Sequence, residues 1–333
     1  MNETTILSSN SVAELAPFRI EPHFDTRVWG FRDLRPWYDR VAEGEPIGEV
    51  WLTGDDCLVS TGPHAGKRLA ALFAEQHTAL LGADAPSPDS PLLIKTLFAR
   101  EKLSVQVHPD DKMAQKYGDP RGKTECWYAL AAEPGAKVAL GVKPGTTVVQ
   151  IEEEIQAGTL EASLNAVPVV AGDMIFVDAG TIHAISPGSI LLETQQNCDL
   201  TYRMFDYGRP RELHIAKSLE ATKLATRAGK IVPQRLADRT VLIDVEYFRV
   251  ERIPVEGSRT SESLRWPGAR RGLAYLFAAA GAGRLAGTGF EQVELPQRGI
   301  VAVPALSPEF VLENVSTAGE LLEVIRITPN WPG

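Results

Sequence analysis

Turn-forming residues divide this chain into many short apolar runs. The 333 residues include 28 Gly and 23 Pro. The apolar runs between them are much shorter than the roughly 20 residues that a membrane-spanning helix needs. Short apolar runs between closely spaced turn residues are typical of β-sandwiches and β-barrels, whereas βαβ proteins alternate strands with longer helical patterns. The sequence therefore predicts a mainly β protein.

Nine segments have the length and composition of strands, and many contain β-branched or aromatic residues that suit a half-buried sheet. They are 91–98, 103–107, 125–130, 174–177, 190–194, 248–253, 273–279, 299–303 and 310–312. Three further segments have helical apolar spacing or helix-end signals, and each ends in glycine: 67–82, 146–158 and 211–229. We expect these three segments to be helical insertions in the β structure.

Charge and cysteine content exclude several classes of protein. The formal net charge is −9, with a pI of about 5.3, which argues against a general polyanion binder. Cys57, Cys126 and Cys198 are odd in number, far apart and without CxxC spacing, so neither a disulfide framework nor a cysteine zinc knuckle is expected. Residues 1–17 lack a secretory signal pattern. We expect a soluble, cytoplasmic protein that binds neither nucleic acid nor membranes.

Histidine is confined to the first two thirds of the chain. All six histidines precede residue 215, and segment 240–333 contains neither His nor Cys while keeping the turn-rich, short-strand pattern. The later segment cannot build a histidine metal site of its own. We therefore predict a catalytic domain at 15–235, with the metal site and the helical insertions, and a metal-free β domain at 236–333.

Two ligand-type residues lie in the segment LSVQVHPDD, which spans 103–111. Side chains alternate along a strand, so Gln106 and His108 share one face, while Val105 and Val107 point to the other. An amide oxygen and an imidazole nitrogen on one face could bind a metal. A histidine at the end of a strand also commonly has a purely structural role.

A carboxylate and a second imidazole come from later segments. Glu125 begins an apolar strand, where burial would require compensation by a cation or by Lys123, although an exposed glutamate at a strand start remains open. His183 follows a tight Asp-Ala-Gly turn. Together with Gln106 and His108 they form a mixed nitrogen and oxygen set, which suits zinc and also iron, manganese or cobalt. A position left to water or substrate would make the site catalytic.

A dense polar segment at 193–207 includes Arg203. Its guanidinium stays protonated at any working pH, so Arg203 suits a phosphate or a developing oxyanion better than a role as a base. The alternative is a structural ion pair between Arg203 and Asp206 or Glu193.

Four motifs in this order closely resemble the type I mannose-6-phosphate isomerases in their short bacterial form. They are LSVQVHPDD at 103–111, KTECWY at 123–128, AGTIHA at 179–184 and QQNCDLTYRMFD at 195–206. The segments PLLIK at 91–95, Trp29-Gly30 and Gly48-Glu49-x-Trp51 are similar to the same family. The resemblance covers roughly residues 15–225, and the rest matches in length and texture.

The resemblance implies two cupin-like jelly-roll modules, with the metal in the first. It implies one Zn²⁺ per chain, bound by Gln106, His108, Glu125 and His183. It also implies that the protein interconverts mannose 6-phosphate and fructose 6-phosphate through a cis-enediol, as a monomer or homodimer. Catalytic and substrate-binding roles map onto Arg203, Lys95 and Lys123, and Glu193 is a further candidate for binding substrate.

Some points stay open at this level. The general acid or base could be a metal-bound water, Glu193, Lys123 or one of the remaining histidines, such as His64. The sequence departs from the family at Phe31 and at 52–55, which we expect on the pocket wall. Two other functions compete with the isomerase: another metal-cupin enzyme acting on a sugar derivative, and a sugar-phosphate-binding or regulatory paralogue without turnover.

Overall fold

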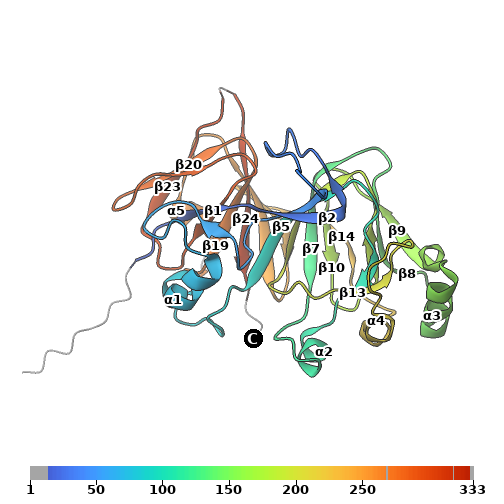
Figure 1. Ribbon diagram of the computed structural model, residues 1–333. Helices are drawn as coiled ribbons and strands as arrows, with labels where there is room; N and C mark the ends of the chain where they lie inside the picture. Colours follow the sequence, from blue (N-terminus) through green and yellow to red (C-terminus); the bar gives the residue numbers. More distant parts are fainter. Residues whose placement is uncertain (1–13, 268, 318, 331–333) are drawn as a thin grey trace, which may run out of the picture.

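Four antiparallel β-sheets stacked as two sandwiches make up the fold (Figure 1). The structure is a computed structural model that describes residues 14–267, 269–317 and 319–330. The predicted mainly β, cupin-like class is confirmed, and each of the nine predicted strand segments contains a strand. None of the helices in the described residues is long and apolar enough to cross a membrane.

The first sandwich consists of a seven-stranded and a five-stranded sheet. In spatial order the seven-stranded sheet contains β14 (Gly229–Ile231), β10 (Met174–Val177), β7 (Glu125–Ala132), β12 (Ser189–Gln196), β5 (Leu92–Ala99), β3 (Ile47–Trp51) and β2 (His23–Phe31). The five-stranded sheet contains β13 (Tyr202–Phe205), β6 (Val105–Val107), β11 (His183–Ile185), β8 (Lys137–Val142) and β9 (Leu164–Pro168). The four predicted metal ligands, together with Lys95, Lys123, Glu193 and Arg203, lie between these two sheets.

The second sandwich consists of an eight-stranded and a four-stranded sheet. The eight-stranded sheet contains β15 (Gln234–Arg235), β16 (Thr240–Asp244), β17 (Phe248–Val255), β24 (Leu322–Pro329), β19 (Ala274–Ala280), β22 (Ile300–Val303), β1 (Phe18–Glu21) and β4 (Leu58–Val59). The four-stranded sheet contains β18 (Ser258–Thr260), β23 (Phe310–Asn314), β20 (Gly283–Gly287) and β21 (Val293–Leu295).

Strand β1 connects the start of the chain to this second sandwich. Phe18 of β1 pairs with Ala302 of β22, and Ile20 of β1 also pairs with Val59 of β4. Two strands from the first 60 residues therefore extend a sheet that is otherwise built from residues beyond 233. The division into domains at 15–235 and 236–333 stays a prediction.

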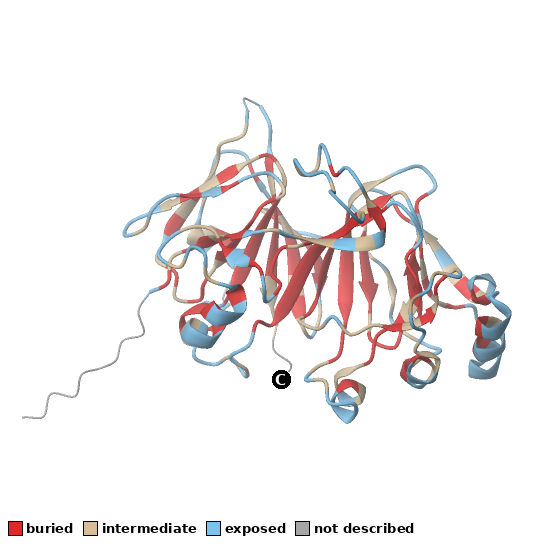
Figure 2. Ribbon diagram, in the orientation of Figure 1, coloured by how far each residue is buried: buried red, intermediate tan, exposed pale blue. Residues whose placement is uncertain are grey.

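The largest apolar core lies between the seven- and eight-stranded sheets, where Figure 2 shows the strands as buried. Alternation along β5 explains how this core and the functional site share one strand. Ile94 and Phe98 pack into the core between the sandwiches, while Leu97 belongs to the core inside the first sandwich. Because neighbouring side chains of a strand point to opposite faces, Lys95 is directed with Leu97 into that interior. Both faces of β5 are buried, so all eight residues are buried.

The helices lie mostly beside the sheets. They are α1 (Leu69–Leu81), α2 (Asp111–Lys116), α3 (Val148–Ala157), α4 (Ile215–Ala221), α5 (Ser261–Leu264) and the short 3-10 helix η1 (Leu160–Ser163). Helix α3 begins with a capping box. The Thr147 hydroxyl accepts a hydrogen bond from the backbone N–H of Gln150, and the Gln150 side-chain oxygen accepts one from the backbone N–H of Thr147. The predictions at 67–82 and 146–158 are confirmed within a few residues at each end.

The predicted helix at 211–229 is wrong for most of its length. Only α4 within it is helical, and the final glycine belongs to strand β14. The Lys223 amide donates to the Gly180 carbonyl, so the chain leaves the helix to follow the turn before β11. A tertiary backbone contact thus replaces the helical continuation that local spacing favoured.

Candidate metal centre

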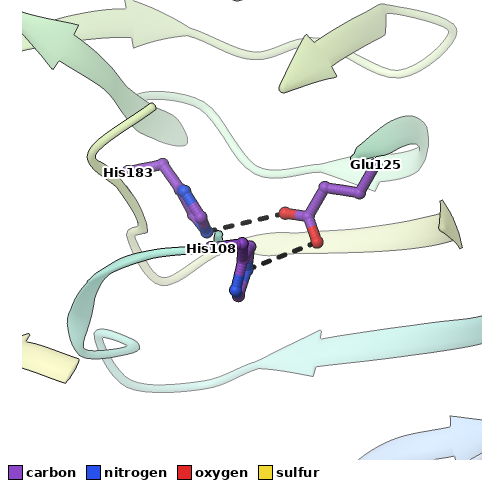
Figure 3. A group of neighbouring side chains, drawn as sticks. All are labelled: His108, Glu125 and His183. Carbon is purple, nitrogen blue, oxygen red and sulfur yellow. Dashed lines mark ion pairs between the residues drawn. The ribbon is translucent and has the colours of Figure 1, made fainter. Parts of the chain in front are cut away.

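Two histidines and a glutamate meet in the interior of the first sandwich (Figure 3). His108, Glu125 and His183 are each no more than 1% exposed. Nε2 of His108 lies 3.5 Å from Oε2 of Glu125, and Nε2 of His183 lies 3.5 Å from Oε1 of the same carboxylate. One donor atom from each residue lies within 4.8 Å of the others.

Three strands and one turn bring these residues together. Glu125 is the first residue of β7 and His183 the first of β11, while His108 directly follows β6. The turn before His183 contains Gly180, whose φ of +94° is strained for any other residue. The Gly180 amide donates to the His108 carbonyl, which joins the two histidine-bearing segments. Local turn chemistry therefore sets the separation of the imidazoles.

The hydrogen bonds of the imidazoles leave one nitrogen of each directed at the centre. Nδ1 of His108 lies 2.9 Å from the Leu200 carbonyl oxygen, and Nδ1 of His183 lies 2.9 Å from the Thr181 carbonyl oxygen. Since a carbonyl can only accept, each Nδ1 carries the proton and each Nε2 keeps its lone pair. This is the arrangement in which backbone carbonyls orient metal-binding histidines.

Nε2 of His108 lacks a hydrogen-bond partner within the described residues, and Oε2 of Glu125, 3.5 Å from it, has Nζ of Lys123 at 3.1 Å as an ion-pair partner. Burial lowers the pKa of His183 to about 4 and that of His108 well below its usual value, so both rings are neutral at neutral pH. Neutral imidazoles whose lone pairs face a buried carboxylate fit a divalent cation. The donor set therefore fits the expected metal cofactor.

The fourth predicted ligand lies beside this group. Gln106 is paired with His183 across β6 and β11, and its amide nitrogen lies 3.2 Å from Nε2 of that histidine. The Ser104 hydroxyl donates to the other amide atom, Oε1. Half a turn of the amide plane would direct Oε1 at the centre instead. All four predicted ligands are thus brought together, and their role as ligands stays a prediction.

Buried ion pairs continue from Glu125 across the seven-stranded sheet. Nζ of Lys123 lies 3.1 Å from the Glu125 carboxylate and 3.5 Å from that of Glu193. Nζ of Lys95 lies 3.7 Å from Glu193 and 3.3 Å from Glu49. The compensation of Glu125 by Lys123 that the sequence left open is present, and Glu125 is not an exposed strand-start residue.

These neighbours shift the pKa values in opposite directions. Burial, followed by the charge of Glu125, raises the pKa of Glu193 to about 7, although Lys95 and Lys123 oppose the shift. Burial alone would lower the pKa of Lys95, but Glu49 and Glu193 raise it above its usual value. The result is a carboxyl that can exchange a proton near neutral pH between two ammonium groups that stay charged.

A cavity of about 540 Å³ opens beside the centre and contains these charges in its walls. Besides predicted residues, the lining includes residues that the sequence analysis missed: Arg27, Trp29, Glu49, Asp199 and Arg211. Glu49 belongs to the Gly48-Glu49-x-Trp51 segment, whose similarity to the family was a signal that could have identified Glu49 as a site residue. Nothing in the local pattern distinguished Arg211.

Arg203 lines the same cavity, but both of its predicted structural partners, Asp206 and Glu193, pair with other side chains. The Asp206 carboxylate accepts two 2.7 Å hydrogen bonds from Arg211. Arg203 instead donates to the backbone carbonyl of Glu212, and its Nε has no partner in the part of the chain that the structure describes. Burial and the charge of Arg211 lower the pKa of Arg203. An anion would relieve this concentration of positive charge.

Two expectations about the pocket wall are wrong. The cavity lining within the described residues includes neither Phe31 nor 52–55. Leu52 is fully buried in the core between the sandwiches, and the Phe31 ring packs edge-to-face on Phe98. His64 lines a different cavity beside Phe290 of the second sandwich, so its candidacy as acid or base has no geometric support.

Comparisons with known proteins agree with this geometry. The family model "Phosphomannose isomerase type I, catalytic domain" matches residues 18–141. A Streptococcus mutans mannose-6-phosphate isomerase is 35% identical over 256 residues, which cover 73% of this chain and 80% of that protein. The Bacillus subtilis protein GmuF, named a probable mannose-6-phosphate isomerase, is 33% identical over 320 residues, covering 89% of this chain and 96% of GmuF.

A crystal structure of mannose 6-phosphate isomerase from Bacillus subtilis is similar over almost the entire fold. Its TM-score is 0.82 at 28% sequence identity, and the match covers 94% of this chain and 99% of that chain. The second sandwich is therefore part of the similarity, which the sequence motifs could not establish.

Proposed function

The chain belongs to the type I phosphomannose isomerase family, and we propose that it interconverts mannose 6-phosphate and fructose 6-phosphate with one zinc ion per chain. The observation that carries the proposal is the buried His108–Glu125–His183 centre, in which two imidazole lone pairs face a buried carboxylate beside a charged cavity. Gln106, His108, Glu125 and His183 would hold the ion. Their mixed nitrogen and oxygen donors support zinc.

Aldose–ketose interconversion removes a proton from the carbon next to the carbonyl and passes through a cis-enediol. The negative charge that develops on oxygen needs electrostatic stabilisation, and a bound zinc ion would supply it as a Lewis acid. Lys123, held at 3.1 Å from Glu125, extends positive charge from the centre into the cavity. Because its neighbours Glu125 and Glu193 raise its pKa against the effect of burial, Lys123 stays charged and can donate to the oxyanion.

The charges of the cavity support one orientation of the sugar phosphate. The Arg203 and Arg211 guanidiniums both line the cavity, and Arg211 is held in place by Asp206. Guanidinium groups match phosphate oxygens with two parallel hydrogen bonds. The phosphate would bind at these arginines, and the carbonyl end of the sugar would then lie toward the metal centre.

Glu193 is the base that the geometry favours. A general base works best when its pKa is close to the working pH, and burial raises the pKa of Glu193 to about 7. The carboxyl faces Lys95 and Lys123, so it can pass a proton between the two sugar carbons while the ammonium groups balance its charge. Lys123, the other side-chain candidate on this wall, is protonated at neutral pH because its pKa is raised, so it has no lone pair to accept a proton.

Turnover of mannose 6-phosphate by the purified protein tests the proposal, with and without removal of metal by a chelator. We expect chelator-sensitive turnover that zinc restores. We expect His183→Ala to lose metal content and activity together, and the exposed His77→Ala on α1 to lose neither. Activity of His183→Ala with metal still bound would contradict the ligand set. A zinc-loaded protein without turnover would instead favour a sugar-phosphate-binding paralogue.

A further inference from the structure

The interior of the second sandwich also contains a buried charged cluster. Glu251 on β17 and Arg326 on β24 pair across the strands. Ile253, two residues after Glu251, and Val324, two residues before Arg326, both belong to the core inside this sandwich. Because residues two apart on a strand share a face, Glu251 and Arg326 point into the same interior. Glu251 is 0% exposed and Arg326 is 7% exposed. Burial of charge at this depth is costly unless it is compensated.

Two arginines share the Glu251 carboxylate in this cluster, and Arg326 has the fewer partners of the two. The Glu251 carboxylate accepts from Arg239 at 3.1 Å and from Arg326 at 2.6 Å. Arg239 has further partners, namely Asp238 and the carbonyls of Ser263 and Leu264. For Arg326, by contrast, the described residues provide the single hydrogen bond to Glu251. Burial lowers the pKa of Arg326 despite that partner, so its charge is incompletely compensated.

The uncompensated guanidinium borders a cavity. Arg326 lines a space of about 50 Å³ whose other charged residues are Arg265, Arg271 and one carboxylate, Glu309, while the rest of the lining is mostly apolar. Glu309 is exposed and already paired with Arg271, so it does not neutralise the Arg326 guanidinium at the buried end of the cavity. One water occupies about 10–15 Å³ of such space. The cavity therefore has room for a few waters or for one tetrahedral oxyanion.

We propose that this cavity in the second sandwich binds a phosphoryl oxyanion, either inorganic phosphate or the phosphoryl end of a phosphomonoester. The planar guanidinium of Arg326 has further N–H groups beyond the one bound to Glu251, and such a fork matches phosphate oxygens. Arg265 adds positive charge at the same cavity, and Arg271, paired with Glu309, offers further N–H donors there. The interiors of the two sandwiches are thus built for ligands of opposite sign, a cation in the first and an anion in the second.

The site is separate from the catalytic cavity, and the inference does not depend on the proposed reaction. None of the residues that line the catalytic cavity lines the one beside Arg326. A test must still separate phosphate bound at Arg203 from phosphate bound at Arg326. Isothermal titration of the full, metal-loaded chain with inorganic phosphate does so by comparing variants of the second cavity in an Arg203→Gln background, because phosphate still held at Arg211 would bind equally in all of them.

In that background we compare Arg271→Gln and Arg326→Lys with Arg270→Gln as the matched control. Arg326→Lys keeps the ion pair to the buried Glu251 but loses the guanidinium fork, so the fold is preserved. Arg270 neighbours Arg271, yet it is exposed and lies outside the cavity lining. Loss of one charge-assisted hydrogen bond predicts phosphate binding about tenfold weaker or more in both cavity variants. The control is expected to bind as its parent does.

Equal phosphate affinity in all four proteins would overturn the proposal, as would an Arg203→Gln parent that binds no phosphate. Methyl phosphate, titrated in parallel, identifies the source of the oxyanion. Tighter binding of methyl phosphate would support a phosphomonoester, and tighter binding of inorganic phosphate would support the free anion.

Discussion

Replacement of Glu193 by glutamine should change how stability depends on pH. Burial, followed by the charge of Glu125, raises the pKa of this carboxyl from 4.5 to about 7 in the folded chain. Below pH 4.5 the carboxyl is protonated in both folded and unfolded states. Between about 4.5 and 7 the unfolded chain loses its proton while the folded chain keeps it, so stability falls as pH rises. The shift corresponds to about 3 kcal/mol.

Glu193→Gln lacks this titration, so the variant should gain stability relative to the wild type as pH rises. The assay is urea unfolding of the metal-free proteins at about pH 5 and about pH 8, where the difference in unfolding free energy should change by about 2.5 kcal/mol. Glu153→Gln, on the exposed face of α3, is the matched control, for which no such change is expected. A difference between Glu193→Gln and wild type that is independent of pH would refute the reasoning.

Metal loading provides an internal check on the same argument. Glu193 and Glu125 share Lys123 as a neighbour, so a dication at the centre would lie one side chain away. Nearby positive charge favours the ionised carboxylate and lowers its pKa. The pH-dependent difference between Glu193→Gln and wild type should therefore shrink in the zinc-loaded proteins. An increase on metal loading would contradict the placement of the carboxyl beside the centre.

Two further substitutions separate substrate binding from folding. Arg203→Lys should lower kcat/KM for mannose 6-phosphate about tenfold or more, because it loses the guanidinium fork, while metal content stays at the wild-type level; loss of metal would argue for a structural role instead. Phe98→Ala should cost about 3–5 kcal/mol in urea unfolding, because Phe98 is 1% exposed in the core between the sandwiches and packs edge-to-face on three aromatic rings. A cost below about 1 kcal/mol would mean that the two sandwiches are not held together by this core.

Local patterns predicted the parts of the site that depend on neighbours in sequence. Alternation on β6 placed Gln106 opposite Val105 and Val107, which pack with the outer helices, as the structure confirms. The Asp-Ala-Gly turn predicted a tight approach to His183, and Gly180 adopts the positive φ that such a turn needs. Side-chain alternation and turn conformation follow from backbone geometry over a few residues, so a single sequence contains them.

The pairings between distant strands were not accessible in the same way. From the sequence, Arg203 suited an ion pair with Asp206 as well as it suited a bound phosphate. In the folded chain the Asp206 carboxylate binds Arg211 instead. Glu49 meets Lys95 through the pairing of β3 with β5. The helix predicted at 211–229 ends early because Lys223 binds the backbone of Gly180. Each outcome depends on contacts between segments that are far apart in the sequence. A local pattern does not show which distant segments come together.

By itself, then, the sequence determined the β class, the residue types of the metal centre and the motifs that identify the family. Tertiary structure decided which charges share a cavity, and therefore that Glu193 titrates near neutral pH while Lys95 stays charged. It also decided that the second sandwich buries Arg326 beside Glu251, whose carboxylate also binds Arg239. Strand propensity and turn chemistry are local properties, whereas burial and Coulomb interactions depend on distances through space that exist once the sheets have paired.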